Sequence, residues 1–160
     1  MQKITIRDAT IKDTDLIIKF IYELAKVEKA EHKVEISREQ IIKTIFEKNT
    51  TTHTIICELD GYSIGHAIYF FNYSTSQGKN GLYIEDIYIS SEYRNLGIGK
   101  EIIKYLSSKA IEKDCCAVEF AVFNRNTSAI GFYKSLGAQP QDKLILYRFS
   151  ESTLKQLVYS

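Results

Sequence analysis

The stretch from Tyr83 to Lys100 constrains the fold of this chain more than any other. Its first part, Tyr83 to Ile89, is rich in Ile and Tyr and lacks Gly and Pro, which predicts a β-strand. A polar turn and the motif Arg94-x-x-Gly97-x-Gly99 follow. The next apolar residues recur at helical spacing: Ile98, Ile102, Ile103, Leu106 and Ala110. A strand, a glycine-containing turn and a helix in succession predict an α/β architecture.

The turn itself has the features of an anion-binding site. Glycines let the backbone approach a bulky ligand, and the first N–H groups of a helix have no partner inside it. Lys100 and Lys104 oppose the helix dipole, and a bound phosphate would turn that penalty into a charge-assisted contact. Glu101 suits a helix N-terminus without any ligand, so a plain turn with surface lysines remains an alternative. The motif is neither a Walker loop nor Gly-x-Gly-x-x-Gly, which points away from both nucleotide folds.

Composition and charge exclude several classes of protein. The formal net charge of +1 and the lack of a basic tract give no reason to expect nucleic acid binding. No apolar run is long enough to cross a bilayer, and residues 2–7 resemble a strand rather than a signal peptide. The three cysteines, Cys57, Cys115 and Cys116, lack metal-ligand spacing. We therefore expect no metal and no membrane association, with reduced, mostly buried thiols in a cytoplasmic protein.

The other elements can be predicted from periodicity and from turn residues. A strand at 2–7 precedes a helix that Thr10 or Asp13 could cap, and a capping box at Ser37 to Gln40 opens a second helix. The later segments are strands at 51–59 and 63–72 joined at Asp60-Gly61, a mobile loop at 73–81, a strand at 116–123, a helix from Asn126 to the Gly137 cap, a strand at 143–149 and a short polar helix. The predicted order is β-α-α-β-β-β-α-β-α-β plus a C-terminal helix. This corresponds to one domain, residues 1–160, with a mixed sheet of the α/β (α+β) type.

The crossover helices place two turns on the same side of the sheet. We therefore expect the turn at 94–100 to share one cleft with Asn126 and Tyr133. In the strand before that turn, strict alternation puts one carboxylate on each face. One face would carry Tyr83, Glu85, Ile87 and Ile89, and the other Ile84, Asp86 and Tyr88.

Two carboxylates in succession on a central strand are costly unless they are paired, hydrated or functional. They could serve as a general base or as anchors for a cation, or be satisfied by backbone N–H groups or a bulge. Taken alone, an aromatic residue such as Tyr133 on that helix is more typical of core packing than of catalysis. The histidines, His32, His53 and His66, form no ligand set and are expected to be structural or on the surface. Without a nucleophile paired with a base, direct transfer fits better than a covalent intermediate.

These motifs resemble those of the GNAT acyltransferase superfamily, which takes an acetyl group from acetyl-CoA. The resemblance rests on Arg94 to Gly99 after a strand, then Asn126, Phe132-Tyr133-Lys134 and Leu136-Gly137-Ala138 in the same order and spacing. Within the superfamily the chain is similar to the diamine (spermidine/spermine) and thialysine acetyltransferases. The matching segments are Ile6-Arg7 with Ala9-Thr10, Glu23 to Lys26 with Glu28, Tyr73 to Thr75, Tyr83 to Asp86 and Glu92 to Arg94.

The resemblance implies a role for each matching residue. Ile87, Tyr88 and Ile89 would pair with the pantetheine arm of acetyl-CoA, and the pyrophosphate would be held by Arg94, Asn95, Leu96, Gly97, Ile98, Gly99 and Lys100, with Asn126 and Lys134 completing the site. Tyr133 would be the general acid for the departing thiolate. Glu85 would take the proton from the substrate ammonium. The amine end would be lined by Val27, Glu28, Glu85 and Asp86.

The chain also departs from these families. Ser74 and Ser76 replace an acid and aromatic residues in the loop before the fourth strand, Val27 replaces an aromatic residue, and the chain has no Trp. A diamine, a lysine-like amino acid or another small primary amine is therefore as plausible an acceptor as a long polyamine. The family implies a homodimer. Transfer to a protein amine and a CoA-binding regulatory module remain alternatives, although the presence of both Glu85 and Tyr133 favours an enzyme.

Overall fold

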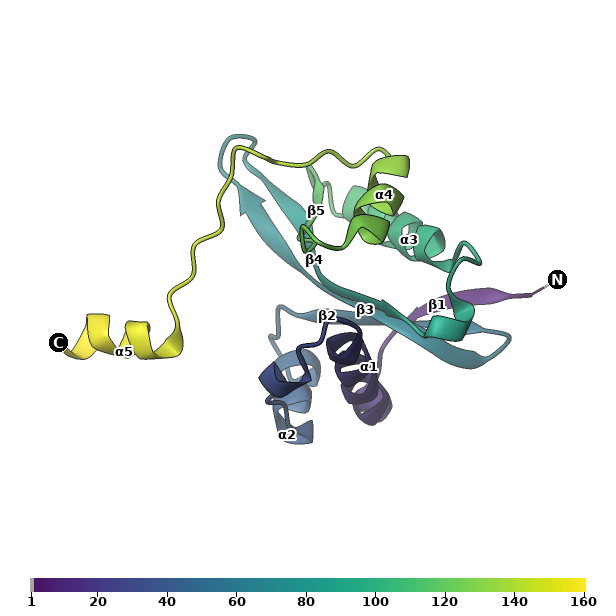
Figure 1. Cartoon of the computed structure of the whole chain (residues 1–160), viewed down its shortest axis with the longest axis horizontal. Helices are drawn as coiled ribbons and strands as arrows, with labels where there is room; N and C mark the ends of the chain where they lie inside the picture. Colours follow the sequence, from purple (N-terminus) through teal and green to yellow (C-terminus); the bar gives the residue numbers. More distant parts are fainter. Residues whose placement is uncertain (1) are drawn as a thin grey trace. The chain divides into compact units, whose positions relative to one another are not determined.

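The computed structural model describes residues 2–160 (Figure 1), which form two compact units divided after Ala121. The first unit is built on a five-stranded sheet in the order β1-β2-β3-β4-β5. The strands are β1 (Ile4–Asp8), β2 (His53–Leu59), β3 (Tyr62–Ser74), β4 (Lys79–Ile89) and β5 (Val118–Phe120). Neighbouring strands are antiparallel except β4 and β5, which are parallel. The predicted mixed sheet is confirmed.

Helices cover both faces of this sheet. α1 (Thr14–Val27) and α2 (Arg38–Ile41) lie on one face and α3 (Ile98–Glu112) on the other (Figure 1). Short turns complete the unit: η1 (Ile11–Asp13), η2 (Glu31–Lys33), the π-helical η3 (Ile42–Phe46) and η4 (Ser91–Tyr93). The apolar stripe predicted for α3 is buried at Ile98, Ile102, Leu106 and Ala110, where it packs against β2, β3 and β4. On the other face Ile17, Ile41 and Ile56 form a second core cluster.

The second unit contains α4 (Thr127–Ser135) and α5 (Glu151–Tyr159). The Asn126 side chain accepts the Ala129 N–H at 3.2 Å and so caps α4, as the sequence indicates. The predicted strand at 143–149 is wrong, because these residues form no strand in the structure. The segment has side chains of strand type, but a strand also needs an adjacent backbone to pair with. Its apolar side chains are 67–85% exposed at Leu144, Ile145, Leu146, Tyr147 and Phe149.

The ends of two other predicted segments also differ in the structure, because a strand extends only as far as its pairing with a neighbour. β3 and β4 remain paired from Asn72–Gly81 to Ser74–Lys79, so the predicted mobile loop at 73–81 shortens to a turn at 75–78. β5 is shorter than the predicted strand at 116–123, because it pairs with β4 only from Val118 to Phe120.

The cysteines are free thiols, and Cys57 is buried, which raises the pKa of its thiol to about 11.

A β-bulge interrupts β4 in its middle. The pairing with β3 changes from Ile68 opposite Asp86 to Tyr69 opposite Ile84, so Glu85 is the extra residue. The predicted alternation is therefore wrong across this point. Ile84 and Ile87 both pack on the α3 side of the sheet, although an uninterrupted strand would place them on opposite faces.

The first strand is tied to the start of α1 by a charged network. Arg7 donates two hydrogen bonds to the Asp13 carboxylate, each 2.9 Å long, and a third to Glu58 at 2.8 Å. Asp13 also accepts the Thr10 N–H at 2.7 Å. The hydrogen bonds from Arg7 lower the pKa of Asp13 from 3.8 to about 2.

Because this pKa is lower in the folded protein, Asp13 stabilises the fold above pH 3.8 and loses that effect as the pH falls to about 2. We expect Asp13→Asn to lower the free energy of unfolding at pH 7 by about 1–2 kcal/mol, allowing for the partial exposure of Arg7. Urea denaturation of both proteins across the acid range measures the difference, which should shrink as the pH falls. The matched control is Asp15→Asn, whose carboxylate is 77% exposed and should matter little. A difference that does not depend on pH would contradict this account.

Candidate active site

The turn between β4 and α3 has the backbone geometry of an anion-binding loop. Asn95 has φ +63° and Gly97 has φ +80°, in the left-handed region that favours glycine. Ile98 then begins α3 and is buried, which anchors the helix N-terminus to the core. Sequence reasoning located this turn because its signals are local.

The backbone N–H groups of this turn are available to a ligand. Within residues 2–160, no N–H from Asn95 to Gly99 donates a backbone hydrogen bond, whereas Lys100 and Glu101 both donate to the Gly97 carbonyl. Unpaired N–H groups at a helix N-terminus attract negative charge. Lys100 is exposed beside these N–H groups. One turn later, Nζ of Lys104 lies 3.9 Å from Oε2 of Glu101. The geometry of the turn is therefore compatible with the prediction that it binds a phosphate or pyrophosphate.

Arg94 is fixed at the end of β4. Its Nε donates to the Ile89 carbonyl at 2.9 Å, and its guanidinium carbon lies 5.8 Å from the centre of the Tyr88 ring. The guanidinium has four further N–H bonds that this contact does not use. Arg94 thus links the residues predicted for the pantetheine arm to the anion-binding turn.

Gly65 of β3 allows β3 and β4 to approach closely near the end of β4, since a Cβ at that position would lie 2.3 Å from the Tyr88 carbonyl oxygen.

The two carboxylates of β4 have different surroundings. Glu85 is exposed to solvent on the bulge. Asp86 has a side chain that is only 18% exposed, and its Oδ2 lies 3.6 Å from Nε2 of the buried His66. Nearby, the Tyr88 hydroxyl donates to Glu23 at 3.2 Å, and burial raises the pKa of Tyr88. The structure therefore separates an accessible carboxylate from a partly enclosed one.

The predicted amine-end residues of α1 lie at its C-terminus. Val27 is 55% exposed, and Glu28 is the half-buried C-cap residue. Sequence reasoning did not assign Glu23 or His66 to the site, although both lie beside β4 residues that it did assign. The available signal for Glu23 was its helical spacing, because residues three apart share a face of a helix and Phe20 lies on the buried face of α1. His66 gave no local signal, because its contact depends on strand register.

The remaining predicted residues belong to the second unit. Asn126 caps α4, while Tyr133 and Lys134 lie within it, and the Phe132 and Tyr133 rings are 5.1 Å apart. The first unit brings the β4 residues together with the turn at 94–100. That Asn126, Tyr133 and Lys134 share a cleft with them stays a prediction, as does the single domain over residues 1–160.

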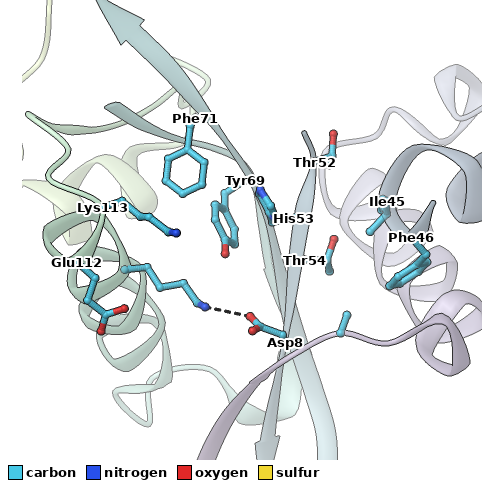
Figure 2. Close-up of a pocket in the computed structure, with 12 residues that line it drawn as sticks. Asp8, Ile45, Phe46, Thr52, His53, Thr54, Tyr69, Phe71, Glu112 and Lys113 are labelled. Atoms are coloured by element: carbon cyan, nitrogen blue, oxygen red, sulfur yellow. Dashed lines mark ion pairs between the residues drawn. The ribbon is translucent and has the colours of Figure 1, made fainter. Parts of the chain in front are cut away.

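A cavity of about 330 Å³ lies elsewhere in the first unit (Figure 2) and contains none of the predicted site residues. Figure 2 shows the Asp8–Lys109 ion pair at one side of it, with a separation of 3.1 Å. His53 stacks on Tyr69 in its wall, with 5.2 Å between ring centres. Mixed charges and aromatic walls do not single out one class of ligand. The exposed turn after β4 therefore remains the better candidate for the ligand-binding site.

Within residues 2–160, two further kinds of feature are absent. Nowhere in this part of the chain do three or more His, Cys, Asp or Glu residues form a group able to hold a metal ion. Over the same residues, no helix combines the length and apolar character needed to span a membrane.

Comparisons with known proteins agree on one family. Residues 18–138 match the model of the acetyltransferase (GNAT) family. The chain is 36% identical over 168 aligned positions to thialysine N-epsilon-acetyltransferase of Mus musculus, covering 98% of each chain. It is 31% identical to spermidine/spermine N(1)-acetyltransferase-like protein 1 of Homo sapiens, covering 99% of this chain and 24% of that protein. Among solved structures, an integron cassette protein from V. cholerae superposes with a TM-score of 0.81 at 25% identity, over 98% of each chain.

Proposed function

The chain belongs to the GNAT acetyltransferase family, and from this premise we propose that it moves an acetyl group from acetyl-CoA to a small primary amine. The proposed acceptor is a polyamine, a diamine or a thialysine-like amino acid. The names of the two relatives support this class, because thialysine, spermidine and spermine all carry primary amines on flexible alkyl chains. The observation that carries the proposal is β4, which has carboxylates in its middle and an anion-binding turn at its end.

Acetyl-CoA would bind along the end of β4 and the start of α3. Its pyrophosphate suits the unpaired N–H groups of residues 95–99, with Arg94 and Lys100 supplying positive charge. The peptide-like pantetheine arm can pair with the backbone of Ile87 to Ile89 as an added strand would. Asn126 and Lys134 of α4 would complete the site. The proposal requires no metal.

The transfer would be direct, within a ternary complex. An alkylammonium is not nucleophilic until it loses a proton, and the exposed Glu85 carboxylate would accept that proton, through water or directly. The amine nitrogen then attacks the thioester carbonyl and forms the amide bond as the carbon–sulfur bond breaks. Tyr133 would protonate the departing thiolate. The products are an acetylated amine and CoA with a free thiol.

Carboxylates would attract the cationic acceptor. Glu28, Glu85 and Asp86 place negative charge on α1 and β4, and opposite charges raise the local concentration of a substrate. Val27 would contact the alkyl chain through its exposed side chain. We further propose a homodimer in the cytoplasm, in which the amine site is completed across two subunits.

A thiol-release assay with acetyl-CoA tests the proposal. The acceptor panel is putrescine, spermidine, thialysine, lysine, an aminoglycoside and a peptide. We expect one small amine to be preferred by a high kcat/KM, with saturation in both substrates. Calorimetry with CoA alone is the control for cofactor binding. Tight CoA binding without turnover of any small amine would overturn the proposal in favour of a protein acceptor or a regulatory CoA-binding module.

A further inference from the structure

His66 is a fully buried histidine in the middle of the sheet. It lies on β3 between Ile56 of β2 and Tyr88 of β4, and its side chain is 0% exposed. The Phe20 ring of α1 meets the imidazole edge-on, with 5.4 Å between the ring centres and 60° between the planes. The ring is thus enclosed by β2, β4 and α1, and it cannot reach solvent.

Neither ring nitrogen of His66 has a hydrogen-bond partner among residues 2–160. A buried polar group without a partner costs roughly 1–3 kcal/mol, so apolar aromatic residues are better suited to a purely structural place in this core. The carboxylate of Asp86 lies close to the ring, with its Oδ2 3.6 Å from Nε2 of His66. That separation exceeds a hydrogen bond by only a few tenths of an ångström.

The Asp86 side chain has less room to move than an exposed carboxylate on the surface. Its side chain is 18% exposed, and the bulge at Glu85 places it on the α1 face, diagonal to His66 across the β3–β4 pair. A second carboxylate near this face, that of Glu23, already accepts the Tyr88 hydroxyl at 3.2 Å, and the cationic Arg94 lies over the Tyr88 ring. Asp86 is therefore the acceptor that the imidazole can reach by a small rotation of the carboxylate.

We propose that His66 is a positioning residue for recognition of the amine. It donates its Nε2–H to one oxygen of Asp86 and holds the other oxygen toward the distal ammonium of a diamine. This inference rests on the proposed function, because it assigns Asp86 to the second cationic centre of the acceptor and leaves proton removal to Glu85. An uncharged imidazole can donate one hydrogen bond without cancelling the charge of its acceptor, so the negative charge of Asp86 stays available to the cation.

The effect on kinetics follows from this division of roles. His66 acts on binding of the distal ammonium, so its loss raises KM for a diamine and leaves kcat nearly unchanged. A hydrogen bond to a charged group contributes enough for a roughly tenfold change in affinity. Butylamine has the same four carbons as putrescine but lacks the second ammonium, so its kinetics do not depend on His66.

The experiment compares His66→Phe, which keeps an aromatic ring beside Phe20, with His66→Gln, which keeps an N–H donor. We expect His66→Phe to raise KM for putrescine about tenfold, and His66→Gln to recover part of that loss. His53→Phe is the matched control, since it removes an imidazole from β2 outside the proposed site and should leave KM unchanged. Thermal unfolding of each variant separates a folding defect from a binding defect.

A double-mutant cycle shows whether His66 acts through Asp86. In the Asp86→Asn background, His66→Phe should produce no further rise in KM. An equal rise in both backgrounds would overturn the inference, as would a loss of kcat with KM unchanged.

If His66→Phe does not fold, NMR of the wild-type protein still decides the question. The ¹⁵N spectrum should show the Nε2–H tautomer, and Asp86→Asn should shift the Nε2 resonance. A proton on Nδ1, or no shift, would overturn the inference. The spectrum requires no turnover, so it also separates failure of this inference from failure of the proposed acetyl transfer.

Discussion

Tyr133→Phe should lower kcat by roughly 100-fold or more and leave CoA binding intact. The substitution removes only the phenolic hydroxyl, which would protonate the thiolate as the carbon–sulfur bond breaks. The ring stays, so the 5.1 Å contact between the Phe132 and Tyr133 rings can persist. Steady-state kinetics with the preferred amine measure kcat, and calorimetry measures the dissociation constant of CoA.

The matched control is Tyr159→Phe, which makes the same change on α5 at a side chain that is 84% exposed. This variant should keep the turnover of the wild type. Near-wild-type turnover in Tyr133→Phe would remove the hydroxyl from the mechanism. A loss of CoA affinity comparable to the loss of kcat would instead assign Tyr133 to binding.

Glu85→Gln is the second large effect that we expect, with kcat/KM for the amine falling by roughly 100-fold. Gln is similar in size and keeps the polarity, but it cannot accept the proton that the ammonium must lose. Because Glu85 is exposed on a bulge, the substitution should change the free energy of unfolding very little. Thiol-release kinetics give kcat/KM, and urea denaturation checks the fold.

Glu112→Gln serves as its control, since that residue lies at the far end of α3 and outside the proposed site. A rise in pH should partly restore Glu85→Gln, because more of the amine is then already deprotonated in solution. Full activity at neutral pH would show that another group accepts the proton. Loss of activity that no pH restores would indicate a binding role for Glu85.

Local signals allowed much of the fold to be predicted. The α3 stripe followed from its helical period, because every fourth or third residue faces the same core. The capping box at Ser37 and Gln40 forms as expected, with hydrogen bonds of 2.7 and 3.2 Å. The turn at 94–100 was likewise evident, since glycine spacing and the following apolar pattern are properties of one short segment.

Pairing between distant segments was not predictable in the same way. Residues 143–149 have the composition of a strand, but a ladder depends on a partner that a local pattern does not specify. The bulge at Glu85 and the approach of His66 to Asp86 both depend on the register between β3 and β4. For the candidate site, the β4 residues and the turn could therefore be identified, whereas the environment of each carboxylate could not. The roles of Tyr133 and Glu85 stay predictions.

The bulge in β4 allows the strand to lose one residue without reversing its faces. Removing Glu85 would restore an uninterrupted ladder with β3 and leave every later side chain of β4 on its present face, because Ile84 and Asp86 already pair with the adjacent residues Tyr69 and Ile68. Asp86 and Tyr88 would still point toward α1, and Ile87 would still pack beneath α3. We therefore expect deletion of Glu85 to remove the exposed carboxylate while the packing on both faces of β4 is retained.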